Sequence, residues 1–226
     1  MNFPIADTVT TIFVDCFDTI IYRKVSKKKV FINWAQELSQ VFNIAWRKIY
    51  KTYQKTNFDL CFKKLFSSFT LQENFEIVLA KMYDKLSKKD LLFDKSLFIK
   101  TAVEVYFKKE LEIFYLNQKM LEFLISQKKI GRKIYLVSDF YCQSNIIKKW
   151  FEELKILDCF ENVFSSSDFN KEKATTKIYK HLIEYLQLNP KNVIMLGDNQ
   201  WSDVLMAKKC KLQAKRIKKL RRYNEI

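Results

Sequence analysis

Short apolar runs, rich in β-branched and aromatic side chains, recur along the chain. Such runs are typical of strands that are buried on both faces of a sheet. The predicted strands are residues 8–16, 133–138, 162–166, 192–196 and 213–217. The helices predicted from apolar residues at helical spacing are residues 117–128, 144–154, 173–186 and 202–209. Strands that alternate with helices predict βαβ units, and therefore an α/β fold with a Rossmann-like parallel sheet.

The segment from residue 22 to residue 115 has a different pattern, because it contains no Gly or Pro and its apolar residues fall at helical spacing. The two clearest apolar faces consist of Trp34, Leu38, Val41 and Phe42, and of Phe75, Val78, Leu79 and Met82. We expect its aromatic residues to form a core rather than a platform for stacking bases (Phe58, Phe62, Phe66, Phe69 and Phe75). The predicted domains are an α/β core, residues 1–21 and 116–226, and an inserted α-helical cap, residues 22–115.

The composition allows a sizeable core and a basic surface. Of the 226 residues, 48% are hydrophobic, and 41 basic residues exceed 25 acidic ones, for a net charge of +16. Such a charge favours acidic partners, including phosphate esters and nucleic acid. However, only six of the basic residues are Arg, the side chain best suited to phosphate clamps. Nucleic acid is therefore a possible but not a favoured partner, and a solvated helix and edge strand is the preferred interpretation of the basic run at residues 208–222.

The cysteine pattern and the absence of long apolar stretches indicate where the protein works. Five Cys are scattered with no CxxC pair, which predicts neither a zinc site nor a disulfide framework. The first residues lack the basic start of a signal peptide. No apolar run is long enough and free enough of charge to cross a membrane. We therefore expect a cytoplasmic protein.

Polar residues that can do chemistry gather at the predicted strand ends. In open parallel sheets, ligands bind beyond the carboxyl ends of the strands. The residues at these ends are Asp15 and Asp18 after the first strand, Ser138 and Asp139 at the second, Lys173 after the third, and Asp198, Asn199 and Asp203 after the fourth. Neighbouring carboxylates repel one another unless a cation is shared between them, and hard oxygen ligands suit Mg²⁺. An Asp beside Mg²⁺ and a Lys can attack phosphorus and form an aspartyl-phosphate.

These segments resemble the four motifs of the haloacid dehalogenase-like (HAD) hydrolase superfamily. VDCFDT looks like the first motif, LVSD the second and MLGDNQWSD the fourth, while Lys173 matches the lysine of the third. The resemblance implies that Asp15 is the nucleophile and that Ser138 and Lys173 hold phosphoryl oxygens. It also implies that Asp198 and Asp203 bind the metal, and that residues 22–115 are the helical cap these enzymes insert after the first motif.

One position departs from the family pattern. Family phosphatases usually carry an Asp two residues after the nucleophile as the general acid and base, and here that residue is Phe17. The backbone carbonyl of Phe17 remains able to bind the metal. Our hypothesis is that Asp18 or an ordered water takes over proton transfer. Family dehalogenases also carry an aromatic residue there, but they act without metal and lack the first acid of the fourth motif.

The sequence thus predicts a Mg²⁺-dependent phosphatase of a small phosphorylated metabolite, with a sugar phosphate as the first expectation. Ser138, Asp139, Lys173 and Asn199 are the predicted substrate-binding residues, and the protein is expected to be a monomer or homodimer. The alternatives are a metal-independent dehalogenase or another transferase of this family. A third is a non-catalytic relative that binds nucleic acid or a protein partner through its basic surface.

Overall fold

The computed structural model describes residues 4–68, 74–87 and 94–218, with no side-chain description for residues 63–68. The chain forms two compact units. The first contains the residues up to Tyr22 and those from Tyr115 onward, and the second is Arg23–Phe114. None of the described helices is both long enough and apolar enough to span a membrane.

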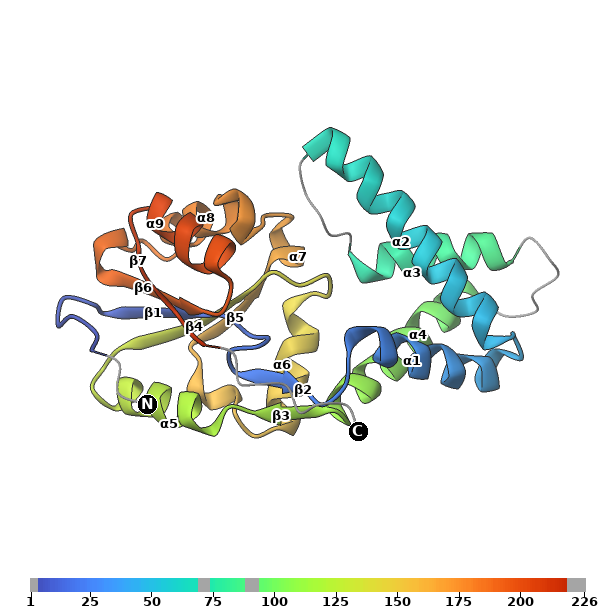
Figure 1. The fold of residues 1–226 in the computed structure, drawn as a ribbon, viewed down its shortest axis with the longest axis horizontal. Coiled ribbons are helices and arrows are strands. Elements are labelled where there is room, and N and C mark those ends of the chain that lie inside the picture. The colour runs from blue at the N-terminus through green and yellow to red at the C-terminus, as the bar shows by residue number, and fades with distance from the viewer. Residues whose placement is uncertain (1–3, 69–73, 88–93, 219–226) are drawn as a thin grey trace. The chain divides into compact units, whose positions relative to one another are not determined.

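A five-stranded parallel sheet is the centre of the first unit (Figure 1). Its strands are β1 (Thr11–Val14), β4 (Lys133–Ser138), β5 (Asn162–Ser165), β6 (Val193–Gly197) and β7 (Gln213–Arg216), in the order β5-β4-β1-β6-β7. In the register, Val14 lies opposite Leu136 on one side and Leu196 on the other. The carboxyl ends of β1, β4 and β6 therefore meet at one edge of the sheet. The predicted α/β fold with a parallel sheet and an inserted helical segment is confirmed.

Helices follow the strands, as expected of βαβ units. They are α5 (Gln118–Lys129), α6 (Ser144–Glu153), α7 (Ser166–Phe169), α8 (Lys177–Tyr185) and α9 (Met206–Lys209), with short helical turns η1 (Leu157–Cys159), η2 (Lys173–Thr175) and η3 (Pro190–Asn192). Phe13, Val137 and Met195 from three strands pack with Ile178 and Leu182 of α8 in one buried cluster. This packing buries the apolar face of α8 and fixes the segment that precedes it.

Two predicted helices are broken next to strand ends. The expected helix 173–186 begins only at Lys177, because Thr176 has a left-handed backbone (φ 66°) after the turn η2. The expected helix 202–209 is a π-helix, η4 (Gln200–Leu205), followed by α9. In η4 the Asn199 side chain accepts hydrogen bonds from the backbone N–H groups of Trp201 and Ser202. π-Helical turns are frequent at functional sites, because they redirect side chains.

Four helices make up most of the second unit. They are α1 (Lys27–Phe42), α2 (Trp46–Ser68), α3 (Phe75–Leu86) and α4 (Lys95–Leu111). Aromatic rings fill the space between them: the Phe31 ring stacks on Tyr53 at 4.4 Å and on Tyr106 at 5.4 Å, and Trp34 and Phe75 lie edge-on or tilted beside them. The helical prediction for this segment is confirmed, and it has a core of its own.

Several residues predicted for this core are exposed instead. Phe58 and Phe62 are 66% and 51% exposed, and their rings stack on each other at 5.8 Å. They lie on a different face of α2 from the buried stripe of Tyr53, Thr56 and Leu60. Val41 is 55% exposed, because it lies in the last turn of α1, beyond the buried part of its face. Phe75 is buried as expected, and the predictions for Phe66 and Phe69 fall on side chains outside the described residues.

A two-stranded sheet marks where the chain passes between the units. It pairs β2 (Ile21–Arg23) with β3 (Phe114–Leu116). Just inside the helical unit, the Arg23 guanidinium makes two hydrogen bonds to the buried Glu110 carboxylate, at 2.7 and 2.8 Å. The Tyr106 hydroxyl donates a third bond to Glu110, at 2.5 Å. This charged group ties the first residue of the helical unit to the end of α4.

Candidate active site

Asp15 lies directly after β1, where the neighbouring strand β6 holds its backbone in place. Its backbone N–H donates to the carbonyl of Leu196 on β6 at 2.8 Å, so Asp15 continues the sheet pairing by one residue. Its side chain is buried, and the Thr19 hydroxyl donates to Oδ2 at 3.4 Å. The turn that follows closes on itself, since the N–H groups of Ile20 and Ile21 both donate to the carbonyl of Cys16. A carboxylate in this position is rigid and points beyond the sheet edge.

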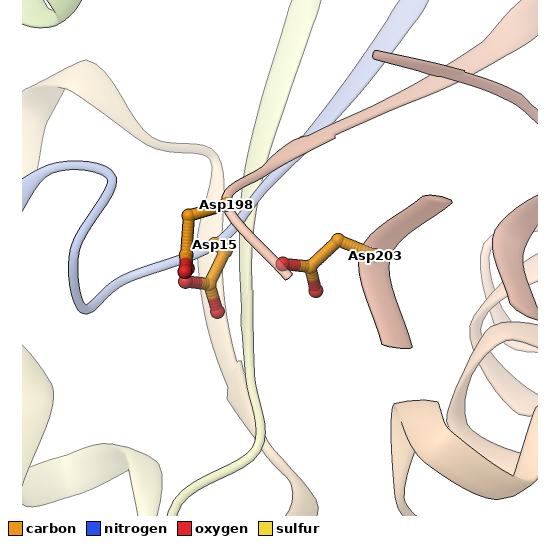
Figure 2. Close-up of side chains that lie close together, drawn as sticks. All are labelled: Asp15, Asp198 and Asp203. Carbon is orange, nitrogen blue, oxygen red and sulfur yellow. The ribbon is translucent and has the colours of Figure 1, made fainter. Parts of the chain in front are cut away.

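Two further carboxylates come from the segment after β6. Asp198 directly follows the strand, and Asp203 returns to it from η4, as Figure 2 shows. The backbone N–H of Asn199 donates to Asp203 Oδ2 at 2.9 Å, and the Ser202 hydroxyl donates to Oδ1 at 3.3 Å. A Cβ atom on Gly197 would lie 2.3 Å from Asp203 Oδ2. Only glycine therefore leaves room for Asp203 to approach the strand end.

The Lys173 side chain joins the acids of β1 and η4. Its Nζ donates to Asp15 Oδ1 at 2.6 Å and to Asp203 Oδ1 at 2.7 Å, and the side chain is 2% exposed. Its backbone N–H donates to Asp139 Oδ1 at 2.8 Å. The η2 turn thus holds the lysine backbone against the end of β4 while the ammonium group reaches across to β1. The predicted helix is interrupted between η2 and α8, and this break accompanies the contacts of the lysine backbone and side chain.

The electrostatics of the site are those of an excess of buried negative charge. Burial raises the pKa of Asp15 from 3.8 to about 7; the charges of Asp203 and Asp198 act in the same direction, whereas Lys173 opposes it. Burial also raises the pKa of Asp139, against the effect of Lys173. Burial alone would lower the pKa of Lys173, but the charges of Asp15 and Asp203 outweigh it and hold that pKa well above its usual value. One lysine leaves the surrounding carboxylates incompletely neutralised.

The acids have the composition and spacing of a site for a hard cation. Asp15, Asp198 and Asp203 are all buried, and each offers a carboxylate oxygen within 4.8 Å of the others. Oxygen donors without nitrogen or sulfur ligands suit Mg²⁺, which is usually held by a few carboxylates and keeps several waters. The raised pKa of Asp15 indicates that a further positive charge would be stabilised there. The residues present therefore fit a magnesium ion.

Ser138 and Asp139 lie at the end of β4, on the other side of Asp15 from β6. The Ser138 hydroxyl is buried and has no hydrogen-bond partner among the described residues. A buried hydroxyl without a partner is costly, so such groups are usually completed by a ligand or water. Asp139 uses one carboxylate oxygen on the Lys173 backbone, so the structure gives it a positioning contact.

The structure gives Phe17 and Asn199 packing or capping contacts, and Asp18 a special backbone conformation. The Phe17 ring packs 4.9 Å from the Phe140 ring and 6.3 Å from the Trp150 ring, which links the loop after β1 to the loop after β4. Asp18 has a left-handed backbone (φ 57°), a conformation that Asp and Asn tolerate better than most residues. The Asn199 side chain caps η4.

Of the predicted residues, the structure brings Asp15, Lys173, Asp198 and Asp203 into one cluster. The sequence analysis missed Thr19 and Ser202, whose hydroxyls donate to Asp15 and Asp203. Thr19 could have been found from its place four residues after Asp15, because a tight turn brings such a residue back to the strand end. For Ser202, the signal was its place inside the fourth motif, directly before Asp203.

Comparisons with known proteins show what the chain is similar to. Residues 9–211 match the family model of the haloacid dehalogenase-like hydrolases. A glyceraldehyde 3-phosphate phosphatase of Pyrococcus furiosus is 32% identical over 87 residues, which cover 38% of this chain and 35% of that relative. The chain thus aligns with about a third of that phosphatase.

Solved structures share the fold at low sequence identity. The YfnB protein of Bacillus subtilis bound to magnesium is 16% identical with a TM-score of 0.56, and the likeness covers 91% of this chain and 85% of YfnB. The L-2-haloacid dehalogenase of Xanthobacter autotrophicus with covalently bound chloropropionic acid is 14% identical with a TM-score of 0.55. That likeness covers 92% of this chain and 77% of the dehalogenase.

Proposed function

The chain belongs to the haloacid dehalogenase-like hydrolase family, and we propose that within it the protein is a Mg²⁺-dependent phosphatase of a small phosphorylated metabolite. The observation that carries this proposal is the cluster of Asp15, Asp198 and Asp203, whose carboxylate oxygens lie within 4.8 Å of one another beside Lys173. A metal-independent reaction has no need of a third buried acid, Asp198, beside the two that bond to Lys173. The similarity to a curated phosphatase over 87 residues supports the same chemistry.

Asp15 is the proposed nucleophile. One of its carboxylate oxygens forms a bond to phosphorus while the bond from phosphorus to the leaving oxygen breaks, which gives an aspartyl-phosphate. Because the Asp15 backbone is held by β6 and the turn after it is closed, the carboxylate is oriented before substrate arrives. Water then cleaves the aspartyl-phosphate, releasing orthophosphate and restoring the carboxylate.

Lys173 and Ser138 are the proposed ligands of the phosphoryl oxygens. The Lys173 ammonium offsets the negative charge of the phosphoryl group, and the free Ser138 hydroxyl donates a hydrogen bond to it. Asp139, which holds the Lys173 backbone, and Asn199, an exposed residue directly after Asp198, are the further proposed contacts at the substrate. These groups require a substrate small enough to reach a largely buried carboxylate.

Magnesium would be held by Asp15, Asp198, Asp203 and the backbone carbonyl of Phe17. When bound, the ion supplies positive charge that lowers the repulsion between the attacking carboxylate and the phosphoryl oxygens. The leaving oxygen still needs a proton, and Phe17 cannot provide one. We propose that Asp18 or an ordered water donates it, and that the same group accepts the proton of the attacking water in the second step.

A metal-independent dehalogenase is the second candidate, because Phe17 places an aromatic ring two residues after the nucleophile. In that reaction Asp15 would attack carbon, release halide and form an ester that water cleaves. EDTA distinguishes the two candidates: it abolishes phosphatase turnover and leaves dehalogenation of 2-chloropropionate intact.

The test is a panel of phosphorylated metabolites assayed with Mg²⁺ and with EDTA. We expect phosphate release that depends on Mg²⁺ in the wild type and its loss in Asp15→Asn, which keeps the shape of the side chain but removes the charged nucleophile. Asp18→Asn tests proton transfer separately: turnover below about 10% of wild type supports the role of Asp18. Near-wild-type turnover would assign proton transfer to water. Full activity of Asp15→Asn, or activity in EDTA, would refute the phosphatase proposal.

A further inference from the structure

The loop after β4 begins with Asp139 and directly follows Ser138, the two residues that the proposed phosphatase needs on that side of Asp15, yet it has no regular structure of its own. It runs from Asp139 to Gln143, between the end of β4 and the start of α6. Most of it is buried, so its backbone carbonyls cannot rely on bulk water for hydrogen bonds. Something in the protein must hold these carbonyls.

Three consecutive serines at the end of β5 provide the bonds. The Ser165 hydroxyl is shared between the carbonyls of Cys142 and Phe140, at 2.7 and 3.1 Å. The Ser166 hydroxyl accepts from the backbone N–H of Phe140 at 3.1 Å and donates to its carbonyl at 3.3 Å. The Ser167 hydroxyl donates to the Tyr141 carbonyl at 3.4 Å. Every loop residue from 140 to 142 is therefore bonded through its backbone to this serine group.

Asp168 secures the same group from the other side. Its Oδ2 accepts from the Ser165 backbone N–H at 3.0 Å, and its Oδ1 accepts from the backbone N–H of Ser144 at 2.9 Å. Ser144 is the first residue of α6, so the carboxylate ties the end of the loop to the end of β5. The serine group is thus itself fixed, as the start of the short helix α7 with a capping box.

The residue that the serines hold most completely, Phe140, connects to the reacting groups in two ways. It directly follows Asp139, whose carboxylate holds the Lys173 backbone, and Ser138 lies one residue earlier. Its ring also packs 4.9 Å from the Phe17 ring, on the loop that follows Asp15. A shift of Phe140 would therefore move the groups that are proposed to hold the phosphoryl oxygens.

We infer that Ser165 and Ser166 are positioning residues, which act through the Phe140 backbone to place Ser138 and Asp139 for phosphoryl binding. The inference rests on the proposed phosphatase function. Small errors in the position of groups around a reacting phosphoryl group cost large factors in rate. The metal acids, in contrast, come from the end of β1 and the segment after β6, and the serines do not hold them. The Phe17 backbone carbonyl lies in the turn after β1, which its own backbone hydrogen bonds close, so the serines do not hold it either. Loss of a serine hydroxyl should thus affect phosphate binding and turnover, but not Mg²⁺ binding.

The experiment compares Ser165→Ala and Ser166→Ala with Ser126→Ala. Ser126 is a matched control, because its hydroxyl also donates to a backbone carbonyl, that of Phe123 at 2.6 Å, but on α5 and away from these loops. For each protein, the readouts are kcat, the affinity of the Mg²⁺-loaded form for inorganic phosphate, and the affinity for Mg²⁺ alone. We expect roughly ten- to a hundredfold losses in kcat and in phosphate affinity for the two variants, with Mg²⁺ affinity within about twofold of wild type. Ser126→Ala should match wild type in all three.

Asp168→Asn provides a milder variant if the buried serine variants do not fold. Asp168 is exposed, and Asn keeps one oxygen acceptor while giving up the other, so a smaller loss of the same kind is expected. Equal losses of Mg²⁺ and phosphate affinity would indicate general destabilisation and overturn the inference, as would unchanged kcat and phosphate affinity in the folded variants. If the wild type binds phosphate but turns nothing over, the phosphatase proposal fails, while the phosphate affinities still test the positioning role.

Discussion

At the scale of single residues, the site is governed by the balance between one buried lysine and several buried acids. Lys173 bonds to Asp15 and Asp203, and nothing else with a positive charge is bonded to these two carboxylates among the described residues. A buried pair of this kind contributes little net stability, because the cost of desolvating the charges offsets much of their attraction. Its value is functional: the ammonium group and the carboxylates are already dehydrated and oriented where phosphoryl charge would be bound.

The raised pKa of Asp15 predicts a pH dependence for Mg²⁺ binding. Since the carboxyl group is held near pKa 7 in the metal-free protein, protons compete with the ion below that pH. Mg²⁺ affinity should therefore fall by about tenfold between pH 8 and pH 6, as the ionised fraction of Asp15 falls. Calorimetric titration with MgCl₂ at both pH values measures this change.

The sign of the shift also governs the stability of the metal-free protein. Because the folded-state pKa of Asp15 lies above its unfolded value of 3.8, the folded state binds the proton more tightly. This contribution favours folding below pH 4 and is lost as the pH rises to about 7.

Asp15→Asn is the control for the Mg²⁺ titrations, because this variant should bind Mg²⁺ weakly and without the tenfold dependence on pH. Equal Mg²⁺ affinity of the wild-type protein at pH 6 and pH 8 would contradict the prediction.

At the scale of elements, the site depends on a close approach between β6 and η4. Gly197 ends the strand and Asp203 returns to it, so that a Cβ atom at residue 197 would lie 2.3 Å from the Asp203 carboxylate. The carboxylate has hydrogen bonds from Asn199, Ser202 and Lys173 that fix it there. The strand end and the π-helix therefore form one unit that sets the position of a metal acid.

Gly197→Ala should consequently displace Asp203 and weaken Mg²⁺ binding by at least tenfold, with a similar loss of turnover. Gly131→Ala is the matched control, because a Cβ atom at this residue would meet no atom within 4 Å and the residue lies outside the site. Because the φ of Gly131 is 88°, alanine there should lower stability by about 1 kcal/mol. The control therefore shows what a loss of stability does to Mg²⁺ binding when Asp203 is not displaced. Mg²⁺ titrations of both variants make the comparison. Equal Mg²⁺ affinity in the two variants would show that Asp203 adapts.

How far the sequence predicts these elements depends on what fixes each one. The buried strands follow from local apolar runs, and β4 was predicted to the residue. The acids and lysine followed from their places at strand ends. The break at Thr176 could not be predicted, because it goes with a contact between distant segments, that of Lys173 with Asp139. The π-helix η4 could not be predicted either, because the close approach of Asp203 to Gly197 leaves no trace in the apolar periodicity. The serine group at the end of β5 was missed for the same reason, since its partners lie 23 to 26 residues earlier.

At the scale of the whole molecule, the chain forms two units with separate cores. One is built on the parallel sheet, and the other on stacked aromatic rings between four helices. In the helical unit, the buried Glu110 carboxylate accepts two bonds from Arg23 and one from Tyr106. Since residue 23 begins this unit and residue 110 lies near its end, the ion pair joins both ends of the segment.

Glu110→Ala should therefore destabilise the helical unit selectively. Removing one partner of a buried ion pair leaves the other charge without compensation, which typically costs about 3–5 kcal/mol. Hydrogen exchange should show faster exchange in α1 and α4, with protection in β1, β4 and β6 unchanged, because the sheet has its own core. Asp84→Ala is the control: its pair with Lys95 in the same unit is exposed, and such pairs contribute at most about 1 kcal/mol. Equal loss of protection in the strands would show that the two cores unfold together.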